Sequence, residues 1–464
     1  MGCQRLPRPA RPVRGPAARS VRISEGGRAR LSAIPGRVLG SVHGDDPACR
    51  IIAVGGLKPL ESDMLLEVVM TVLMVFAVMC TLYWLAVAFQ VRRTARLLPS
   101  ARDGIAIAEQ DPPTQRVCVI VPCHNEAGNI ATLIASLKEQ DYDRLRVVLA
   151  LDRCSDDTAG VARRAIGDDA RFEIIEITEC PDDWAGKVHA AHTGYHRSEH
   201  ARNADVLIFT DADTQMDPAC VRACIAIMRH RGLDFFSLLS TLNSETWFER
   251  FVQPITAFEL ARQYPLLRVN RGDERQRAFA NGQFMMFDAG VYRQIGGHES
   301  VRDAILEDIA FARRIMYQKH RGGLLMADRM LNCRMYDSWP EYTRGWKRIY
   351  TESANREIKR LRRYALRVPV VTAMLPAMSL LLVVVALFTG PDTIPLAIGL
   401  LAVASWLLGL SMVYRMSHAP LRDLPMSLLG AFLTGRIFWE AARDLSQGTP
   451  TTWGGRSYVR KAEG

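Results

Sequence analysis

The sequence predicts an α/β domain with a mostly parallel sheet, flanked by membrane-spanning helices. Between residues 115 and 345, four short apolar runs alternate with helical patterns, as a parallel sheet requires. Acidic and other polar residues follow these runs at the points where strands would end, and long uncharged stretches lie on both sides of the region. The four apolar runs cover residues 117–121, 147–151, 172–177 and 206–209.

The uncharged stretches predict a transmembrane helix over residues 64–91 and a transmembrane helical hairpin over residues 368–415. Arg92, Arg93 and Arg96 follow the first helix directly. Basic residues favour the cytoplasmic side of a membrane, so they place the intervening domain in the cytoplasm. The expected location is therefore the cytoplasmic (inner) membrane, crossed several times.

The basic charge of the chain is concentrated at its beginning. The net charge is +10, and the first 60 residues hold eleven Lys or Arg against three acidic residues, which accounts for +8. This distribution argues against nucleic-acid binding by the folded domain. Residues 1–63 are interpreted as a disordered basic arm or a mispredicted start, with translation expected to begin near Met64.

Two further segments lie close to the predicted membrane. Residues 346–367 form a basic juxtamembrane segment before the hairpin. In residues 424–464, Arg436 and Glu440 interrupt an apolar stretch that is too short to span, which predicts an interfacial helix followed by a C-terminal tail. An aromatic stripe at residues 247–258 has helical spacing, typical of a core helix and also compatible with a membrane surface.

Paired carboxylates end the fourth apolar run, in the sequence LIFTDAD. Asp211 and Asp213 would emerge at the rim of a sheet, where open α/β sheets bind ligands. Hard oxygen ligands suit Mg²⁺ or Mn²⁺, which complete their shells with substrate phosphates and water. The alternative is a solvated turn, in which Asp is common.

Three other places carry candidate functional groups. Asp152 follows the second apolar run, where a carboxylate could accept hydrogen bonds from a ribose or base. Lys187 follows Gly186 at the start of a predicted helix and could meet a phosphate. Glu307 and Asp308 begin another helix, where acids serve the helix dipole or, alternatively, one of them acts as a general base.

In this order, the motifs resemble those of membrane-bound family 2 glycosyltransferases with a GT-A fold. The resemblance covers roughly residues 115–350. Within the family, the sequences ANGQFMMF, IGGHESV and LED are most similar to hopene-associated and carotenoid-type glycosyltransferases. The fold class implied is a Rossmann-like, mostly parallel GT-A domain on the cytoplasmic side of flanking transmembrane helices.

The resemblance also implies roles for individual residues. Asp308 would be the catalytic base, with Glu307 beside it, and Asp211 and Asp213 would bind a divalent cation, Mg²⁺ or Mn²⁺. The acceptor or leaving-group region would include Gln283, His298, Arg344 and Trp346, with a structural loop histidine as the alternative for His298. The nucleotide sugar would be bound by Pro122, Asn125, Glu126, Asp152, Lys187 and Asp211.

The sequence departs from the family pattern at two motifs. Leu151 stands where the first of two adjacent Asp residues is common, which leaves Asp152 as the candidate. The Gln-x-x-Arg-Trp motif of processive synthases is replaced by EYTRGW, with Glu341 for Gln and Gly345 inserted before Trp346. This difference favours transfer of a single sugar.

The expected activity is therefore inverting transfer of one sugar from a nucleotide-diphosphate sugar to a membrane lipid. The alternatives are a processive polysaccharide synthase and a non-catalytic, nucleotide-binding membrane scaffold. The expected partners are the sugar donor, the acceptor lipid and the bilayer, without nucleic acid.

Overall fold

The computed structural model describes residues 62–264, 266–273, 276–304, 306–390, 393–449, 451–453 and 456–458. The predicted basic arm or mispredicted start, residues 1–63, lies outside the described residues, except where helix α1 begins at Ser62. The last part of the predicted C-terminal tail, residues 459–464, also lies outside them.

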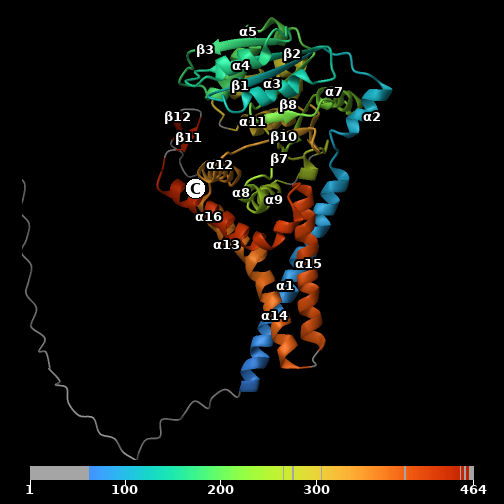
Figure 1. The fold of residues 1–464 in the computed structure, drawn as a ribbon, viewed down its shortest axis with the longest axis vertical. Coiled ribbons are helices and arrows are strands. Elements are labelled where there is room, and N and C mark those ends of the chain that lie inside the picture. Colours follow the sequence, from blue (N-terminus) through green and yellow to red (C-terminus); the bar gives the residue numbers. More distant parts are fainter. Residues whose placement is uncertain are drawn as a thin grey trace, which may run out of the picture. The chain divides into compact units, whose positions relative to one another are not determined.

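A seven-stranded mixed sheet forms the centre of the domain, in the order β3-β2-β1-β4-β8-β6-β9 (Figure 1). All four apolar runs form strands, and these four strands are parallel neighbours. Strand β8 is antiparallel to both β4 and β6, and β9 is parallel to β6. The predicted mostly parallel sheet is confirmed. The strands are β1 (Val117–Cys123), β2 (Leu145–Asp152), β3 (Phe172–Ile177), β4 (Val206–Thr210), β6 (Phe235–Leu239), β8 (Phe284–Asp288) and β9 (Gly322–Met326).

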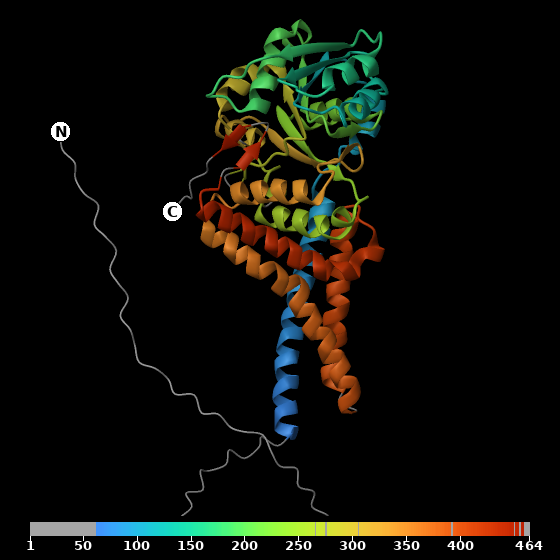
Figure 2. The ribbon, with the colours of Figure 1, turned by 60° about the vertical axis from the view of Figure 1, so that its left-hand side comes forward.

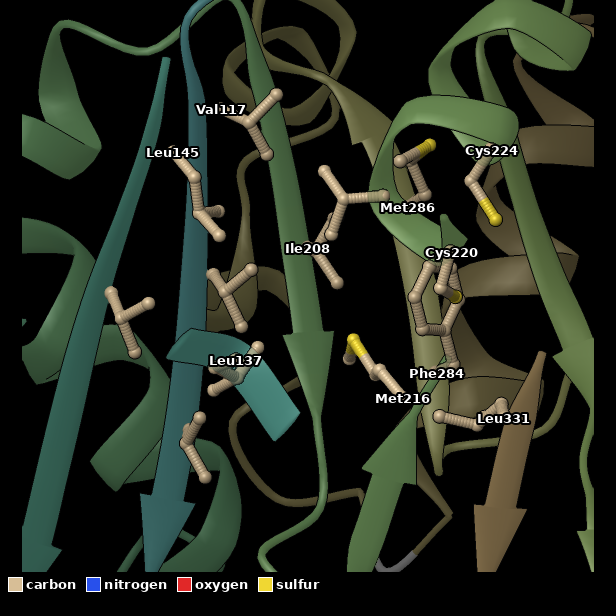
Figure 3. Close-up of a cluster of buried hydrophobic side chains, with 14 of the residues drawn as sticks. Val117, Leu137, Leu145, Ile208, Met216, Cys220, Cys224, Phe284, Met286 and Leu331 are labelled. Atoms are coloured by element: carbon tan, nitrogen blue, oxygen red, sulfur yellow. The ribbon is translucent and has the colours of Figure 1, made fainter. Parts of the chain in front are cut away.

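Helices bury both faces of this sheet. Side chains alternate along a strand, so Val119 and Ile120 of β1 enter different apolar clusters. Figure 3 shows the first cluster, in which Leu137 of α3 packs with side chains of the strands, among them Ile208 of β4 and Met286 of β8. One face carries α3 (Ile130–Lys138), α4 (Thr158–Ile166) and α7 (Cys220–Arg231), and the other carries α5 (Gly186–Arg197), α10 (Ala289–Gln294) and α11 (Glu307–Tyr317).

Short elements connect these layers. A three-stranded sheet has the order β5-β10-β7, and a hairpin pairs β11 with β12. The elements are α2 (Asp103–Gln110), α6 (Glu199–Arg202), β5 (Thr214–Met216), β7 (Thr241–Leu242), β10 (Leu331–Cys333), β11 (Thr451–Trp453), β12 (Arg456–Tyr458), and the 3₁₀ turns η1 (Leu266–Arg268), η2 (His298–Val301) and η4 (Leu421–Met426).

Three helical stretches are long and apolar enough to cross a membrane: Met64–Leu97, Ile358–Thr389 and Thr393–Met416. They pack side by side in Figures 1 and 2. The second stretch joins α13 (Ile358–Pro369) to α14 (Leu375–Thr389) through a π-helical turn, η3 (Val370–Met374), which directly follows Pro369. The other two are α1 (Ser62–Leu97) and α15 (Thr393–Met416).

Four helices lie between the sheet domain and these long helices: α8 (Trp247–Phe251), α9 (Gln253–Gln263), α12 (Trp339–Ser353) and α16 (Ser427–Ser446). Phe248, Ile255 and Phe258 from the aromatic stripe are buried in their shared core, so the core interpretation of that stripe is correct. Helix α12 runs through residue 345, where the catalytic domain was predicted to end.

Candidate functional site

The carboxyl ends of β1, β2 and β4 open onto one polar cavity of about 430 Å³. These strands are parallel neighbours, so the residues that follow them emerge at the same edge of the sheet. The first turn of α5 forms another part of the wall. The lining includes every residue predicted to bind the nucleotide sugar, together with the second predicted metal ligand: Pro122, Asn125, Glu126, Asp152, Lys187, Asp211 and Asp213.

Lys187 connects this cavity to the two acidic residues that begin α11. Its Nζ lies 2.7 Å from Asp211 Oδ1 and 2.6 Å from Glu307 Oε1. Burial alone would lower the pKa of Lys187, but the two carboxylates raise it overall. The lysine is therefore charged, and it joins residues that are almost one hundred positions apart in the sequence.

The DAD carboxylates are partly exposed, and Lys187, which also binds Glu307, cannot neutralise both of them. Burial, together with the nearby carboxylates of Asp211 and Glu126, raises the pKa of Asp213 to about 8. Burial likewise raises the pKa of Asp211, although Lys187 opposes that shift. One carboxylate oxygen, Oδ1 of Asp213, is buried without a hydrogen-bond partner.

This pair of carboxylates fits a hard divalent cation. An unpartnered buried oxygen and an excess of negative charge are both costly unless a cation or a proton compensates them. Among the described residues, no group of three or more His, Cys, Asp or Glu side chains could hold a metal ion by itself. Asp211 and Asp213 would thus leave much of the coordination shell to substrate and water oxygens, as Mg²⁺ sites commonly do.

Asp308 occupies the first turn of α11, next to Glu307. Its Oδ2 accepts a hydrogen bond from the backbone N–H of Gly282 at 2.9 Å, and its Oδ1 accepts one from Ile309 at 2.7 Å. Burial, reinforced by the carboxylate of Glu307, raises the pKa of Asp308 to about 7. A carboxyl group with this pKa can exchange a proton near neutral pH.

Gly282 allows these charged groups to approach one another. A Cβ atom at this position would lie 3.3 Å from Asp308 Oδ2, Glu307 Oε1 and Lys187 Nζ. Such contacts are tight, so any side chain here would push on all three polar atoms at once. Gly282 belongs to the ANGQFMMF sequence, where sequence reasoning gave it no role.

Asp152 is held by an arginine that sequence reasoning missed. Arg153 donates from Nη2 to Asp152 Oδ2 at 2.6 Å and from Nε to Oδ1 at 2.9 Å. The backbone of Arg153 has φ +47°, an uncommon conformation for a residue other than glycine. The ring Nδ1 of His124 lies 2.7 Å from the carbonyl oxygen of Asp152. The two flanking side chains thus fix the end of β2.

A second cavity, of about 250 Å³, has mainly apolar walls and is bordered by Asp308. Gln283 and Trp346, two of the residues predicted for the acceptor region, also line it. Gln283 is fixed there, because Asn281 donates to its Oε1 at 3.1 Å and its Nε2 donates to Cys333 Sγ at 2.9 Å. Other lining residues include Thr94, Ala257, Phe258, Leu260, Ala261, Tyr264, Leu306, Ile309, Ile349, Met416 and His418.

Comparison with known proteins gives one match to a family: residues 118–296 match the family described as Glycosyl transferase family 2. The chain carries a family 2 glycosyltransferase domain. The matched residues include Asp152, Lys187, Asp211 and Asp213, and they end before Glu307 and Asp308. The GT-A fold class predicted from the sequence agrees with the family match and with the sheet.

The glycosyltransferase domain also resembles individual proteins. It is 22% identical over 205 residues to a 4,4'-diaponeurosporenoate glycosyltransferase from Staphylococcus haemolyticus, a match that covers 43% of this chain and about half (51%) of the relative. This relative agrees with the carotenoid-type resemblance seen in the sequence.

Two solved structures are similar at low identity. A mannosyltransferase from Pyrobaculum calidifontis, PcManGT, in complex with GDP-Man and Mn²⁺, gives a TM-score of 0.43 at 16% identity and covers 82% of this chain and 98% of its own. TarS residues 1–349 from S. aureus, in complex with UDP-GlcNAc, gives a TM-score of 0.35 at 12% identity and covers 75% and 97%. Both TM-scores are too low to support a structural inference.

Two predicted residues of the glycosyltransferase domain lie away from both cavities described above. His298 is only 1% exposed, and its Nδ1 lies 2.8 Å from the hydroxyl of Tyr292, in an aromatic cluster with Phe209 and Phe311. Its ring fills the core behind Lys187, so the structure supports the structural alternative for His298 and gives no support to contact with the acceptor. Arg344 is exposed on α12 and lines neither cavity.

Arg348, rather than Arg344, is the arginine of α12 whose charge acts on Asp211. It lies one turn further along α12, and its charge lowers the pKa of Asp211 against the larger effect of burial. The two arginines are four positions apart, so they lie on neighbouring parts of the same helix face. The sequence shows the basic pair, but only the packing of α12 decides which member approaches the site.

Three polar side chains near the polar cavity hold the loops that precede helices or follow strands. Asp217 accepts a hydrogen bond from the backbone N–H of Ala219 at 3.0 Å, in the loop just before α7, whose first turn has no side-chain cap. Asp156 accepts one from the N–H of Thr158, the first residue of α4. Asn125 does not cap a helix: its Oδ1 accepts from the N–H of Ser155 and ties the loop after β1 to the loop after β2.

Proposed function

We propose that this chain is an inverting glycosyltransferase that moves one sugar from a nucleotide-diphosphate sugar to a membrane lipid. The observation that supports this most directly is the bridge made by Lys187. It binds Asp211, on the wall of the polar cavity, and Glu307, which precedes the candidate base Asp308 on the wall of the apolar cavity. One lysine therefore lies where a donor and an acceptor would meet.

Asp308 is the group proposed to remove the acceptor's proton. The hydroxyl oxygen of the acceptor forms a bond to the anomeric carbon while the bond from that carbon to the diphosphate oxygen breaks. The proton passes to the Asp308 carboxylate, whose pKa of about 7 lets it accept and release a proton near neutral pH. Attack from the face opposite the leaving group inverts the anomeric configuration.

Lys187 and a divalent cation are proposed to stabilise the departing nucleoside diphosphate. Lys187 supplies a fixed positive charge at the start of α5, where helix geometry also favours anions. Asp211 and Asp213 would hold the Mg²⁺ or Mn²⁺, which when bound neutralises charge on the diphosphate. Asp152 would contact the nucleoside, in competition with its present partner Arg153.

The apolar cavity is proposed to hold the reacting end of the acceptor. Its walls come from α9, from α12 and from the end of α15, and Thr94 of α1 also contributes. Helices α1 and α15 are two of the spans long enough to cross a membrane, so this cavity lies beside the predicted bilayer. The name of the relative describes action on a diaponeurosporenoate, which agrees with an apolar acceptor.

We further propose that the catalytic domain faces the cytoplasm of the inner membrane. Arg92, Arg93 and Arg96 extend the apolar part of α1 toward the sheet domain. Basic residues at the end of a span favour the cytoplasmic side. Nucleotide sugars made in the cytoplasm would then reach the polar cavity without crossing the bilayer.

Filling the apolar cavity should weaken the acceptor's binding without affecting the donor. We expect Ala257→Trp, on the cavity wall of α9, to raise the KM for the acceptor at least about tenfold, because its volume displaces an apolar group of the lipid. Steady-state kinetics with donor and acceptor varied separately would measure this. The matched control is Ala135→Trp, on the exposed face of α3. An unchanged acceptor KM in Ala257→Trp would contradict the placement of the acceptor.

Cation binding should require Asp213 and should be strengthened by the nucleotide. We expect electron paramagnetic resonance of Mn²⁺ to show bound ion in the presence of a nucleoside diphosphate, and this signal should disappear in Asp213→Asn. Asp217→Asn is the matched control, since Asp217 does not line the polar cavity and its side chain accepts only from the backbone of Ala219 before α7. Equal Mn²⁺ binding by the two variants would show that Asp213 is not a ligand.

The proposed function is tested by incubating membranes that contain the chain with radiolabelled nucleotide sugars and extracting the products. Label in the lipid extract, as a single added sugar, is the expected result. Label in a long water-soluble polymer would instead indicate a processive synthase, which the replacement of Gln by Glu341 argues against. Neither transfer nor hydrolysis with any sugar donor would indicate a nucleotide-binding scaffold.

A further inference from the structure

Helices α13 and α16 pack against each other along their length, outside the two cavities (Figures 1 and 2). Their contact is apolar, with Leu361 and Ala365 of α13 and Phe438 of α16 buried in the same cluster. Each helix therefore has one face buried in the core, and its opposite face is available for another interaction.

The outward face of α16 combines large apolar residues with arginines. The exposed residues recur at spacings of three and four, which places them on one side of the helix. Phe432 is 58% exposed and Trp439 is 51% exposed. Although 20 residues long, α16 is not among the spans apolar enough to cross a membrane. The exposed residues on this side are Leu429, Phe432, Arg436, Trp439 and Arg443.

The outward face of α13 changes along its length from basic to apolar. Lys359, Arg362 and Arg363 are exposed in its first two turns, and Leu366 and then Val370 are exposed after them. The same helical stretch continues through η3 into the apolar α14, which is part of a candidate membrane span. The change from basic to apolar residues marks where this stretch would enter the bilayer.

The two outward faces meet at an arginine and a tryptophan. The guanidinium carbon of Arg362 lies 6.0 Å from the centre of the Trp439 ring. We name the exposed residues of the two helices the α13–α16 surface: Lys359, Arg362, Arg363 and Leu366 from α13, and Leu429, Phe432, Arg436, Trp439 and Arg443 from α16.

The basic groups of this surface outnumber its acids. Arg436 pairs with Glu440, 2.7 Å away, and Arg443 lies 3.7 Å from Asp444, which also binds Lys347. In the part of the chain that the structure describes, no carboxylate forms an ion pair with Lys359, Arg362 or Arg363, whereas Arg367 of the same helix pairs with Glu259. A positive surface that also exposes aromatic and aliphatic side chains fits a negatively charged membrane surface.

We propose that the α13–α16 surface binds the anionic phospholipid headgroups of the bilayer. Trp439, Phe432 and Leu429 insert among the upper acyl carbons, and Arg362, Arg363 and Lys359 contact the phosphates. The surface is continuous with a span that enters the same membrane, so the two helices bind the leaflet beside that span. This binding is independent of sugar transfer and adds a lipid site to the chain outside both cavities.

The test uses the full chain reconstituted in vesicles that contain phosphatidylcholine and phosphatidylglycerol, with one of the two lipids brominated at a time. Bromine quenches tryptophan fluorescence at short range. The Trp439 contribution is obtained as the difference between the unchanged chain and Trp439→Phe. We expect stronger quenching of Trp439 by brominated phosphatidylglycerol than by brominated phosphatidylcholine at equal mole fraction.

Removing the α13 charges should abolish this lipid preference. In Arg362→Gln/Arg363→Gln, the enrichment of phosphatidylglycerol at Trp439 should fall by about fivefold for each residue, while quenching by total lipid persists. The matched control, Arg231→Gln/Arg293→Gln, removes two exposed arginines of the sheet domain and should leave the preference unchanged. Retained near-ultraviolet circular dichroism shows that each variant is folded.

Two outcomes would overturn the proposal. Equal quenching by both brominated lipids, unchanged in the double variant, would mean that the arginines do not select anionic headgroups. No quenching of Trp439 by either lipid would mean that the surface does not touch the bilayer and is covered by protein, either a second copy of the chain or another partner.

Discussion

Asp308→Asn is expected to lower the rate of sugar transfer by about 10²–10⁴-fold while leaving donor binding nearly unchanged. The asparagine keeps the shape of the side chain, and its oxygen can still accept the hydrogen bond from Gly282, but it cannot take a proton. The measurement is the initial rate of label transfer at saturating donor and acceptor, together with the donor's dissociation constant. Asp303→Asn, an exposed neighbour, is the matched control.

The same residue should set the pH dependence of transfer. Asp308 must be ionised to act as a base, and its pKa is raised to about 7, so the rate should increase as the pH rises through about 7 and then level off. An ordinary carboxylate would already be ionised well below that pH. A flat profile between pH 5.5 and 8.5 in the unchanged chain, or full activity of Asp308→Asn, would rule out this role for Asp308.

Lys187→Met should damage both stability and activity. Removing the lysine leaves Asp211 and the nearly buried Glu307 without their shared partner. We expect this to lower the free energy of unfolding by about 3 kcal/mol. This value is at the lower end of the range for a buried ion pair, because the Lys187 side chain is 23% exposed. Transfer should also fall at least about 100-fold, because a fixed positive charge beside the leaving diphosphate is lost. Thermal unfolding and transfer rates measure the two effects separately.

A double variant separates these two roles of Lys187. Lys187→Met/Glu307→Gln removes one of the carboxylates that the single variant leaves unpaired, so it should recover part of the lost stability without recovering activity. Lys319→Gln, at an exposed position after α11, is the control for loss of a lysine charge. Recovery of transfer in the double variant would show that Lys187 acts only by holding the protein together.

The parallel part of the sheet could be predicted because each strand is a local apolar run. Phe172–Ile177 was predicted with the bounds that the structure has, and the other three strands differ by at most two residues at either end. Strands β6, β8 and β9 were not predicted. Strand β8 inserts antiparallel between β4 and β6, a pairing set by residues far apart in the sequence that no local pattern records.

The carboxylates of the site were predictable for a related reason. Residues at the carboxyl ends of parallel strands lie at one edge of the sheet. Asp152, Asp211 and Asp213 therefore come together independently of the conformation of the connecting loops. The partners of these residues were not predictable. Arg153 holds Asp152 through an unusual backbone conformation, and Arg348 rather than Arg344 approaches Asp211 because of how α12 packs.

His298 shows the limit of reasoning from sequence position. It lies in the sequence IGGHESV, where the family resemblance implied a place in the acceptor region and a structural histidine was the alternative. In the structure its ring packs against Phe209 and Phe311, and burial lowers its pKa well below the usual value, so it is neutral. Only the tertiary packing distinguishes this core histidine from a histidine that contacts substrate.

The central claim is a single displacement in which Asp308 takes the acceptor's proton, and the anomeric configuration of the product tests it most directly. The glycolipid formed from a donor of known configuration would be isolated, and the coupling constant of its anomeric proton measured by nuclear magnetic resonance. A sugar of inverted configuration is predicted. A product that retains the donor's configuration would contradict the proposed mechanism.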